Sequence, residues 1–225
     1  MKRFLKIFLL GVCLGILATA IRYRFHMSQS TFWTYFGLAA ALAVVSAVLF
    51  NWLYTRVYQQ KMAQAVKLLE EGKTSDYILT MERLLEKVKG TYLKNLFQLN
   101  LAAGYCNAKQ FHQATRLLEE LSGARLPGVA RMVYHLNLCA CYFYTGQPAR
   151  AMELYESCQK EFAPFREGPS YGGNLAVLDM FAAIQRRQYS QAKELLGRAR
   201  ETWNLPRLQD DYNCIEAELV RRKKM

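Results

Sequence analysis

The chain has 225 residues and a formal net charge of +12, with 30 basic and 18 acidic residues. Its six cysteines lie within apolar stretches of helical spacing, which argues against a disulfide-stapled secreted domain and favours a reducing compartment. Residues 1–55 contain no Asp or Glu, so the acidic residues all fall in the remainder of the chain. This division predicts two domains, a membrane anchor over residues 1–55 and a cytosolic helical domain over residues 56–225.

The segment from Phe32 to Tyr54 has no charged residue and is long enough to cross a hydrocarbon layer of about 30 Å as a helix. Aromatic residues lie at both of its ends, among them Trp33 and Trp52. Such rings are favoured where a helix passes through the two headgroup layers. We therefore expect a transmembrane helix over residues 32–54.

The preceding apolar segment, residues 5–21, has two interpretations. It forms a first membrane helix, which gives a helical hairpin, or it is a signal peptide cleaved near Ala18-Thr19-Ala20. Small residues at helical spacing favour the hairpin, because they let two backbones approach closely in a membrane. These candidate packing residues are Gly11, Gly15 and Ala18 in the first segment and Gly37 and Ala41 in the second.

Both interpretations place the C-terminal domain in the cytosol. The basic residues Arg56 and Lys61 follow the second helix directly, as expected on the cytosolic side of a membrane. The basic start of the chain followed by an apolar run is typical of a bacterial plasma-membrane protein.

The C-terminal domain contains two similar phrases, residues 99–105 (LNLAAGY) and 136–142 (LNLCACY), which lie 37 residues apart. A short polar break follows each phrase, and then an apolar stripe of helical spacing that includes Ala114 in the first copy and Ala151 in the second. Each copy is therefore expected to be a helix, a tight turn and a second helix. Further helices are expected over about 76–88, 175–186, 190–203 and 208–224. The expected fold class is all-α.

The domain resembles a tetratricopeptide repeat (TPR) array over about residues 60–206. The matching residues are Leu101, Ala102, Tyr105, Ala114 and Leu118 in the first repeat, Leu138, Cys139, Tyr142, Gly146, Ala151 and Tyr155 in the second, and Ala183, Tyr189, Ala192, Leu196 and Ala199 in a weaker third. In the pair before them Tyr77 and Leu84 fit, but Thr80 replaces the Ala of the family pattern, and the turn glycine is Lys109 in one repeat and Arg187 in another. The resemblance implies an α-solenoid of antiparallel helix pairs, with the last helix as a cap.

The resemblance also implies a concave surface that is lined by the first helix of each pair and binds a protein or peptide partner. The candidate partner-binding residues are Asn100, Asn107, Asn137, Phe143, Tyr144 and Phe181, with Leu99, Ala103, Val133, Ala140 and Asn174 as further groove positions. Asn100 and Asn137 occupy equivalent places, where an amide can both donate to and accept from a bound backbone. The alternative is that these amides bond to neighbouring helices. The Lys and Arg companions of a carboxylate clamp are not at the matching positions.

No nucleophile–base pair, metal-spaced cluster or phosphate-binding loop is recognisable, so we expect no enzymatic activity, no cofactor and no metal. The basic C-terminus, residues 221–224, predicts attraction to anionic lipid headgroups, and nucleic-acid binding is not expected because no reader motif is present.

The expected function is a membrane-anchored scaffold or adaptor that binds a partner protein. The alternative is a structural subunit of a membrane complex that oligomerises through its transmembrane and terminal helices.

Overall fold

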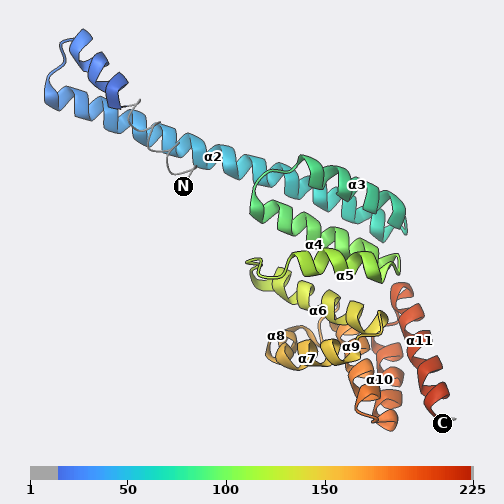
Figure 1. Ribbon diagram of the computed structural model, residues 1–225. Coiled ribbons are helices and arrows are strands. Elements are labelled where there is room, and N and C mark those ends of the chain that lie inside the picture. Colours follow the sequence, from blue (N-terminus) through green and yellow to red (C-terminus); the bar gives the residue numbers. More distant parts are fainter. Residues whose placement is uncertain (1–14, 224–225) are drawn as a thin grey trace. The chain divides into compact units, whose positions relative to one another are not determined.

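The computed structural model describes residues 15–223 and divides the chain into two compact units, residues 1–57 and 58–225. All regular secondary structure in the described residues is helical, and none of it is strand (Figure 1). This confirms the all-α fold class. Each unit is described separately below.

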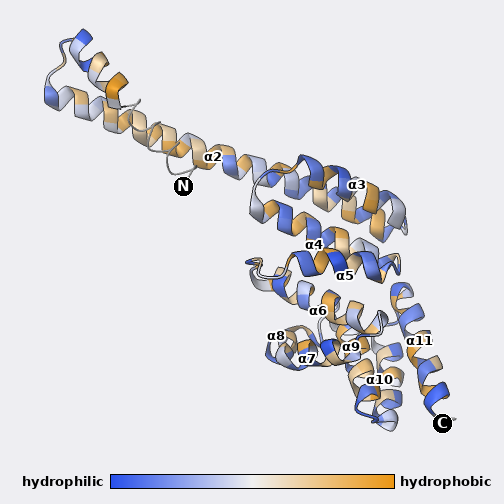
Figure 2. Cartoon of the chain, viewed as in Figure 1, coloured by the Kyte–Doolittle hydropathy of each residue, from blue (hydrophilic) through white to orange (hydrophobic). Residues whose placement is uncertain are grey.

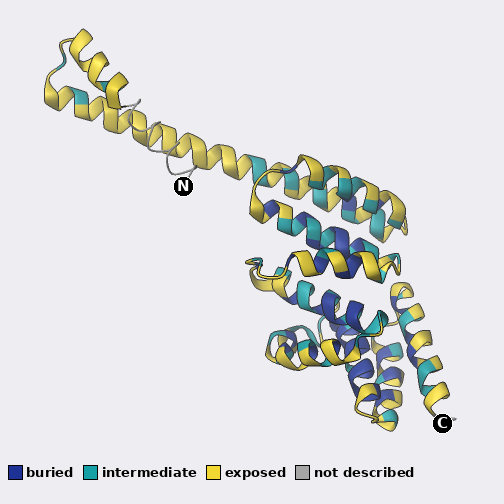
Figure 3. Ribbon diagram, in the orientation of Figure 1, coloured by how far each residue is buried: buried dark blue, intermediate teal, exposed yellow. Residues whose placement is uncertain are grey.

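The first unit contains a helical segment over residues 15–24, a turn at residues 25–26 and the beginning of α2 (Gln29–Glu70). Ser28 caps α2, since its hydroxyl accepts a hydrogen bond from the Thr31 backbone N–H at 3.2 Å. An 18-residue window of α2 has a mean hydropathy of 2.0, and none of that window is buried (Figures 2 and 3). Length and composition make α2 a candidate membrane span.

The small residues that were predicted to pack the membrane helices are only partly described. Gly11 lies outside the described residues. An added Cβ at Gly15 or Gly37 would meet no described atom within 4 Å. Ala18 is half-buried and Ala41 is exposed. The described part of this unit therefore shows no close backbone approach at Gly15 or Gly37.

The second unit is a succession of helices in which α3 to α8, and then α9 to α11, each contact the next helix in the chain. In addition, α4 contacts α6, and α6 contacts α9. The helices are α3 (Thr74–Lys87), α4 (Thr91–Asn107), α5 (Phe111–Glu120), α6 (Gly128–Tyr144), α7 (Pro148–Ser157), α8 (Gln159–Phe162), α9 (Gly172–Gln185), α10 (Tyr189–Thr202) and α11 (Pro206–Lys223), with a short 3₁₀ helix, η1 (Ala163–Phe165), after α8. The sequence did not predict α8 and η1.

Four turns of one kind end α2, α4, α6 and α9. In each turn one residue has a positive φ, and the next residue donates its backbone N–H to the carbonyl five positions earlier, which is a common way to end a helix. The positive-φ residues are Gly72 (75°), Lys109 (59°), Gly146 (74°) and Arg187 (60°). The backbone hydrogen bonds are Lys73 to Leu68, Gln110 to Tyr105, Gln147 to Tyr142 and Gln188 to Ala183, at 2.8–2.9 Å. Lys109 and Arg187 therefore adopt the conformation that glycine adopts in the other two turns.

The fifth residue after three of these turns is a fully buried alanine. Ala114, Ala151 and Ala192 are each 0% exposed. The fifth residue after the first turn is Tyr77, whose large side chain is only 1% exposed. The sequence pattern assigns this alanine position to Thr80 instead. Gly104 on α4 makes room for the ring, because an added Cβ there would lie 2.6 Å from Tyr77 Cε1.

A recurring tyrosine–glutamate hydrogen bond joins α4 to α3 and α6 to α5. The Tyr105 hydroxyl on α4 donates to Glu82 on α3 at 2.6 Å, and the Tyr142 hydroxyl on α6 donates to Glu119 on α5 at 3.1 Å. Both partners in the second bond lie 37 residues after those in the first. The bond to Glu82, together with burial, raises the pKa of Tyr105 to about 12. Burial and the bond to Glu119 raise the pKa of Tyr142 to about 12 as well. Both tyrosines are therefore neutral donors at neutral pH.

The contact at Gly104 predicts opposite effects of the same substitution at two helical glycines. We expect Gly104→Ala to lower the free energy of unfolding by about 1–2 kcal/mol, because overpacking against Tyr77 outweighs the higher helix propensity of Ala. Tyr77 has little freedom to move, since its hydroxyl donates to the Asn100 carbonyl at 2.8 Å. The matched control is Gly197→Ala on α10, where an added Cβ meets no described atom within 4 Å. It should raise the free energy of unfolding by up to about 1 kcal/mol.

Urea denaturation of the full chain in detergent, followed by far-UV circular dichroism, measures both effects. A gain in stability at both positions would contradict the close approach at Gly104.

The turn at Arg187 predicts a stabilising substitution. Arg187 is exposed and has a φ of 60°. This left-handed conformation is less stable by roughly 1–2 kcal/mol for a residue other than glycine. Arg187→Gly should therefore raise the free energy of unfolding by about 1 kcal/mol. The reciprocal control, Gly146→Ala, should lower it by a similar amount. Thermal denaturation of the two variants beside wild type checks the sign, and a destabilised Arg187→Gly protein would rule this explanation out.

Candidate binding groove

The second unit contains a groove of about 530 Å³. Its walls come from α4, α6 and α9, from the C-terminal end of α2 and from the beginning of α11 with the residues around these helices. Phe111, the first residue of α5, is the single lining residue from the second helices α3, α5, α7 and α10. The groove therefore lies on the side of the unit that the first helices of the pairs form.

The groove walls are largely apolar, with an asparagine on each of three successive first helices. The apolar lining residues include Val66, Leu69, Ala103, Val133, Leu136, Ala140, Val177, Leu205 and Leu208. The amides are those of Asn107 on α4, Asn137 on α6 and Asn174 on α9. The Asn137 Nδ2 is buried and has no hydrogen-bond partner among the described residues. Leaving a buried donor unpaired costs about 1–3 kcal/mol, so a bound acceptor that reaches this amide would relieve that cost.

Asp211 fixes α11 to the wall of the groove. Its carboxylate Oδ1 accepts a hydrogen bond from the Tyr144 hydroxyl at 2.6 Å and forms an ion pair with Lys109 Nζ at 2.8 Å. Phe111 stacks on the Tyr144 ring with a centroid distance of 4.2 Å. Burial, and then the negative charge of Asp211, raise the pKa of Tyr144 far above its ordinary value. Tyr144 is thus held as a neutral donor between α6 and α11.

The structure places three of the six candidate partner-binding residues in the groove. Asn107, Asn137 and Tyr144 line it, together with the further groove positions Ala103, Val133, Ala140 and Asn174. The Asn107 amide also donates to the Thr74 hydroxyl at 3.4 Å.

The other three candidates do not line the groove. The Asn100 amide donates to the Leu96 carbonyl of its own helix at 2.9 Å. Phe143 and Phe181 stack on each other at 5.1 Å, and Phe181 is 9% exposed. Leu99, a further groove position, is buried in the core. Asn100 and Asn137, which are equivalent in sequence, therefore have different surroundings: Asn137 lines the groove and Asn100 does not.

The sequence did not reveal Asp211 as a groove residue. It precedes Tyr212, which belongs to the apolar stripe that packs α11 on the core. A carboxylate next to a buried apolar stripe lies at the edge of the packed face of its helix. This position beside Tyr212 was the only feature of the local sequence that pointed to Asp211. Its partners, Lys109 and Tyr144, lie 102 and 67 residues away in the chain.

The basic C-terminus is partly neutralised within its own helix. Arg221 and Arg222 form ion pairs with Glu218 at 2.6 and 2.9 Å. Such exposed pairs are weak and remain accessible to other anions. Residues 224–225 lie outside the described residues.

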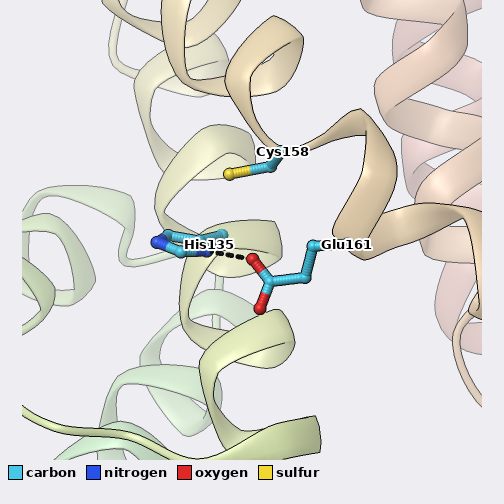
Figure 4. A group of neighbouring side chains, drawn as sticks. All are labelled: His135, Cys158 and Glu161. Atoms are coloured by element: carbon cyan, nitrogen blue, oxygen red, sulfur yellow. Dashed lines mark hydrogen bonds and ion pairs between the residues drawn. The ribbon is translucent and has the colours of Figure 1, made fainter.

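A second group of polar side chains lies elsewhere in this unit (Figure 4). His135 Nδ1 and Glu161 Oε2 are 2.7 Å apart, and Cys158 Sγ lies within 4.8 Å of both groups. Burial alone would raise the pKa of Glu161, but the hydrogen bonds from Arg131 and His135 outweigh it and hold the pKa below its ordinary value. Sequence spacing did not reveal this group, because Cys158 lies 23 positions after His135.

Comparison with known proteins gave no match at a significant level, whether to a family model, to a curated protein or to a solved structure.

The bond between Tyr144 and Asp211 predicts a loss of stability in alkali. Because the pKa of Tyr144 is higher in the folded than in the unfolded chain, the unfolded chain loses this proton first as the pH rises through about 10. The contribution of Tyr144 to stability is therefore complete below pH 10 and falls by about 1.4 kcal/mol at about pH 11. Tyr144→Phe lacks this proton and should lose about that much less stability than wild type between about pH 9 and pH 11. Chemical denaturation of both proteins across this range tests the prediction, which an equal loss in the two proteins would refute.

Proposed function

We propose that this protein is a membrane-anchored interaction module of TPR-like architecture, whose groove binds an extended segment of a partner protein. Residues 32–54 serve as the membrane anchor and residues 58–225 carry the groove. The observation on which the proposal rests is the unpaired buried amide of Asn137 in a largely apolar groove.

Three regularities support the TPR-like architecture. The turns at residues 72, 109 and 146 recur every 37 residues, and the next follows at 187. A fully buried Ala lies five residues after three of them. The first helices of successive pairs supply most of the groove, as in helical repeat arrays that bind ligands on a concave surface.

The membrane anchor is supported by the composition of α2 and by the residues that follow its apolar part. Arg56 stacks over the Trp52 ring at 5.1 Å, where an aromatic and a basic residue suit a cytosolic headgroup layer. With the basic N-terminus, this favours an integral protein of a bacterial plasma membrane whose large domain faces the cytosol. Such a protein acts by raising the local concentration of its partner at the membrane, with no chemistry of its own.

The chemistry of the groove selects the partner segment. Its volume lies within the range of about 300–1,000 Å³ that is typical of ligand sites. Apolar walls favour apolar side chains, and the Asn137 Nδ2 supplies a donor for a backbone carbonyl of the segment. The basic groups at the groove, Lys109 and Arg207, are engaged by Asp211 and by the Ser170 carbonyl. A segment with apolar side chains is therefore favoured over an acidic one.

Site-specific photocrosslinking in cells tests the groove. A photoreactive residue at Ala140 should give a discrete adduct with a partner, whereas the same residue at Arg116, exposed on α5, should not. An adduct equal to the mass of two copies of this chain would instead indicate self-association, the alternative expected from the sequence. Equal adducts from both positions would contradict binding in the groove.

The amide of Asn137 allows a sharper experiment. Asn137→Leu keeps the branched shape of the side chain, is somewhat larger and removes the unpaired donor, so it should raise the free energy of unfolding by about 1 kcal/mol. The same change removes the hydrogen bond to the partner and should lower the yield of the Ala140 adduct about tenfold. Asn100→Leu is the matched control, since Asn100 does not line the groove. An unchanged adduct yield in Asn137→Leu would remove this amide from the binding site.

A further inference from the structure

We propose that His135, Cys158 and Glu161 form a zinc-binding site that joins α6 to the segment between α7 and α9 (Figure 4). This site is separate from the groove, which none of the three residues lines. The proposal does not depend on the proposed function.

Two helical segments bring the three side chains together. His135 lies on α6, Cys158 lies between α7 and α8, and Glu161 lies on α8. Cys158 and Glu161 are one helical turn apart, and the Glu161 backbone N–H donates to the Cys158 carbonyl at 3.0 Å. This spacing places both side chains on one side of the chain, facing His135. One nitrogen, one sulfur and one oxygen atom thus lie within 4.8 Å of one another.

The three donor types suit zinc. Zinc binds imidazole nitrogen, thiolate sulfur and carboxylate oxygen at about 2.0–2.3 Å, usually with four tetrahedral ligands. Three protein ligands leave one position for water. The side chains of His135 and Glu161 are 22% and 18% exposed, so an ion and its water can reach them. Cys158 is 6% exposed, which limits access of other molecules to its sulfur.

Arg131 organises the carboxylate. Its Nε donates to Glu161 Oε1 at 2.8 Å, which leaves Oε2 directed at His135. Zinc ligands of the carboxylate type are commonly oriented by such a bond to the other oxygen. The positive charge of Arg131 opposes cation binding, but its side chain is 60% exposed and water screens that charge.

Binding requires a rearrangement in which the contact between His135 and Glu161 opens and Cys158 Sγ, which lies within 4.8 Å of the other two ligand atoms, moves closer to them. Tetrahedral bonds of about 2.0–2.3 Å separate ligand atoms by about 3.3–3.6 Å. The ion therefore replaces the 2.7 Å contact between His135 and Glu161, which opens by somewhat more than half an ångström. Cys158 binds as the thiolate and His135 through an unprotonated Nδ1. The thiol proton is therefore released to solvent, and the Nδ1 proton that His135 donates to Glu161 is exchanged through solvent to Nε2 as the bonds to zinc form.

Cobalt and zinc titrations of the full chain test this site. The protein is purified in detergent without a polyhistidine tag, treated with a chelator and titrated with Co²⁺ alone. We expect one ion per chain and a near-UV charge-transfer band from a cobalt–thiolate bond, which Zn²⁺ then displaces. Free Zn²⁺ at about a hundred times Kd should raise Tm by about 5–10 °C.

Four variants identify the ligands. Cys158→Ser should abolish the charge-transfer band, and His135→Gln and Glu161→Gln should each weaken Zn²⁺ binding at least about tenfold. Cys214→Ser, which removes an exposed thiol outside the cluster, should bind as wild type does. Circular dichroism confirms that each variant folds, and His135→Gln and Glu161→Gln still decide the matter if Cys158→Ser does not.

Two results would overturn the proposal. The first is a cobalt spectrum without a thiolate band in the wild-type protein. The second is binding that persists in His135→Gln and Cys158→Ser but disappears in Cys214→Ser, which would assign the metal to the exposed thiol.

Discussion

The close approach of helices at small residues is the constraint on which the second unit depends. A left-handed residue ends each first helix, and five residues later the chain places a fully buried small residue, Ala114, Ala151 or Ala192, in the core. Tyr77 occupies the position of the alanine after the first turn, and the residue that packs against its ring is Gly104, which has no side chain. Close-packed interiors leave no room for two large groups at one crossing, so a bulky residue on one helix requires a small one opposite.

The groove follows from that packing. The first helices α4, α6 and α9 contact one another in succession, and together they line the groove, to which the second helices contribute Phe111. The ion pair and hydrogen bond of Asp211 then hold α11 against this surface. The result is a largely apolar groove in which the unpaired Asn137 amide is the most direct polar anchor for a bound segment.

Helix α6 takes part in both proposed sites. Asn137 lines the groove and His135 belongs to the His135–Cys158–Glu161 cluster, and residues two apart lie about 200° apart around a helix. Zinc at the cluster would tie this helix to α8 and so restrict the movement of the residue that contacts the bound segment. Without the ion, the same carboxylate is already held by Arg131 and His135, which gives the cluster an ordered arrangement before metal enters.

The sequence by itself determined what depends on near neighbours in the chain. Apolar periodicity predicted the helices, the uncharged run predicted a helix long enough to cross a membrane, and the repeated phrase located two of the four similar turns. Tertiary structure alone decided which side chains meet: Asn137 lines the groove while Asn100 bonds within its own helix, Tyr77 rather than Thr80 takes the alanine position, and Asp211 reaches Lys109. It also brought His135 to Cys158 and Glu161. The physical reason is that a helix forms through bonds four residues apart, whereas contacts between helices depend on how their side chains pack at each crossing.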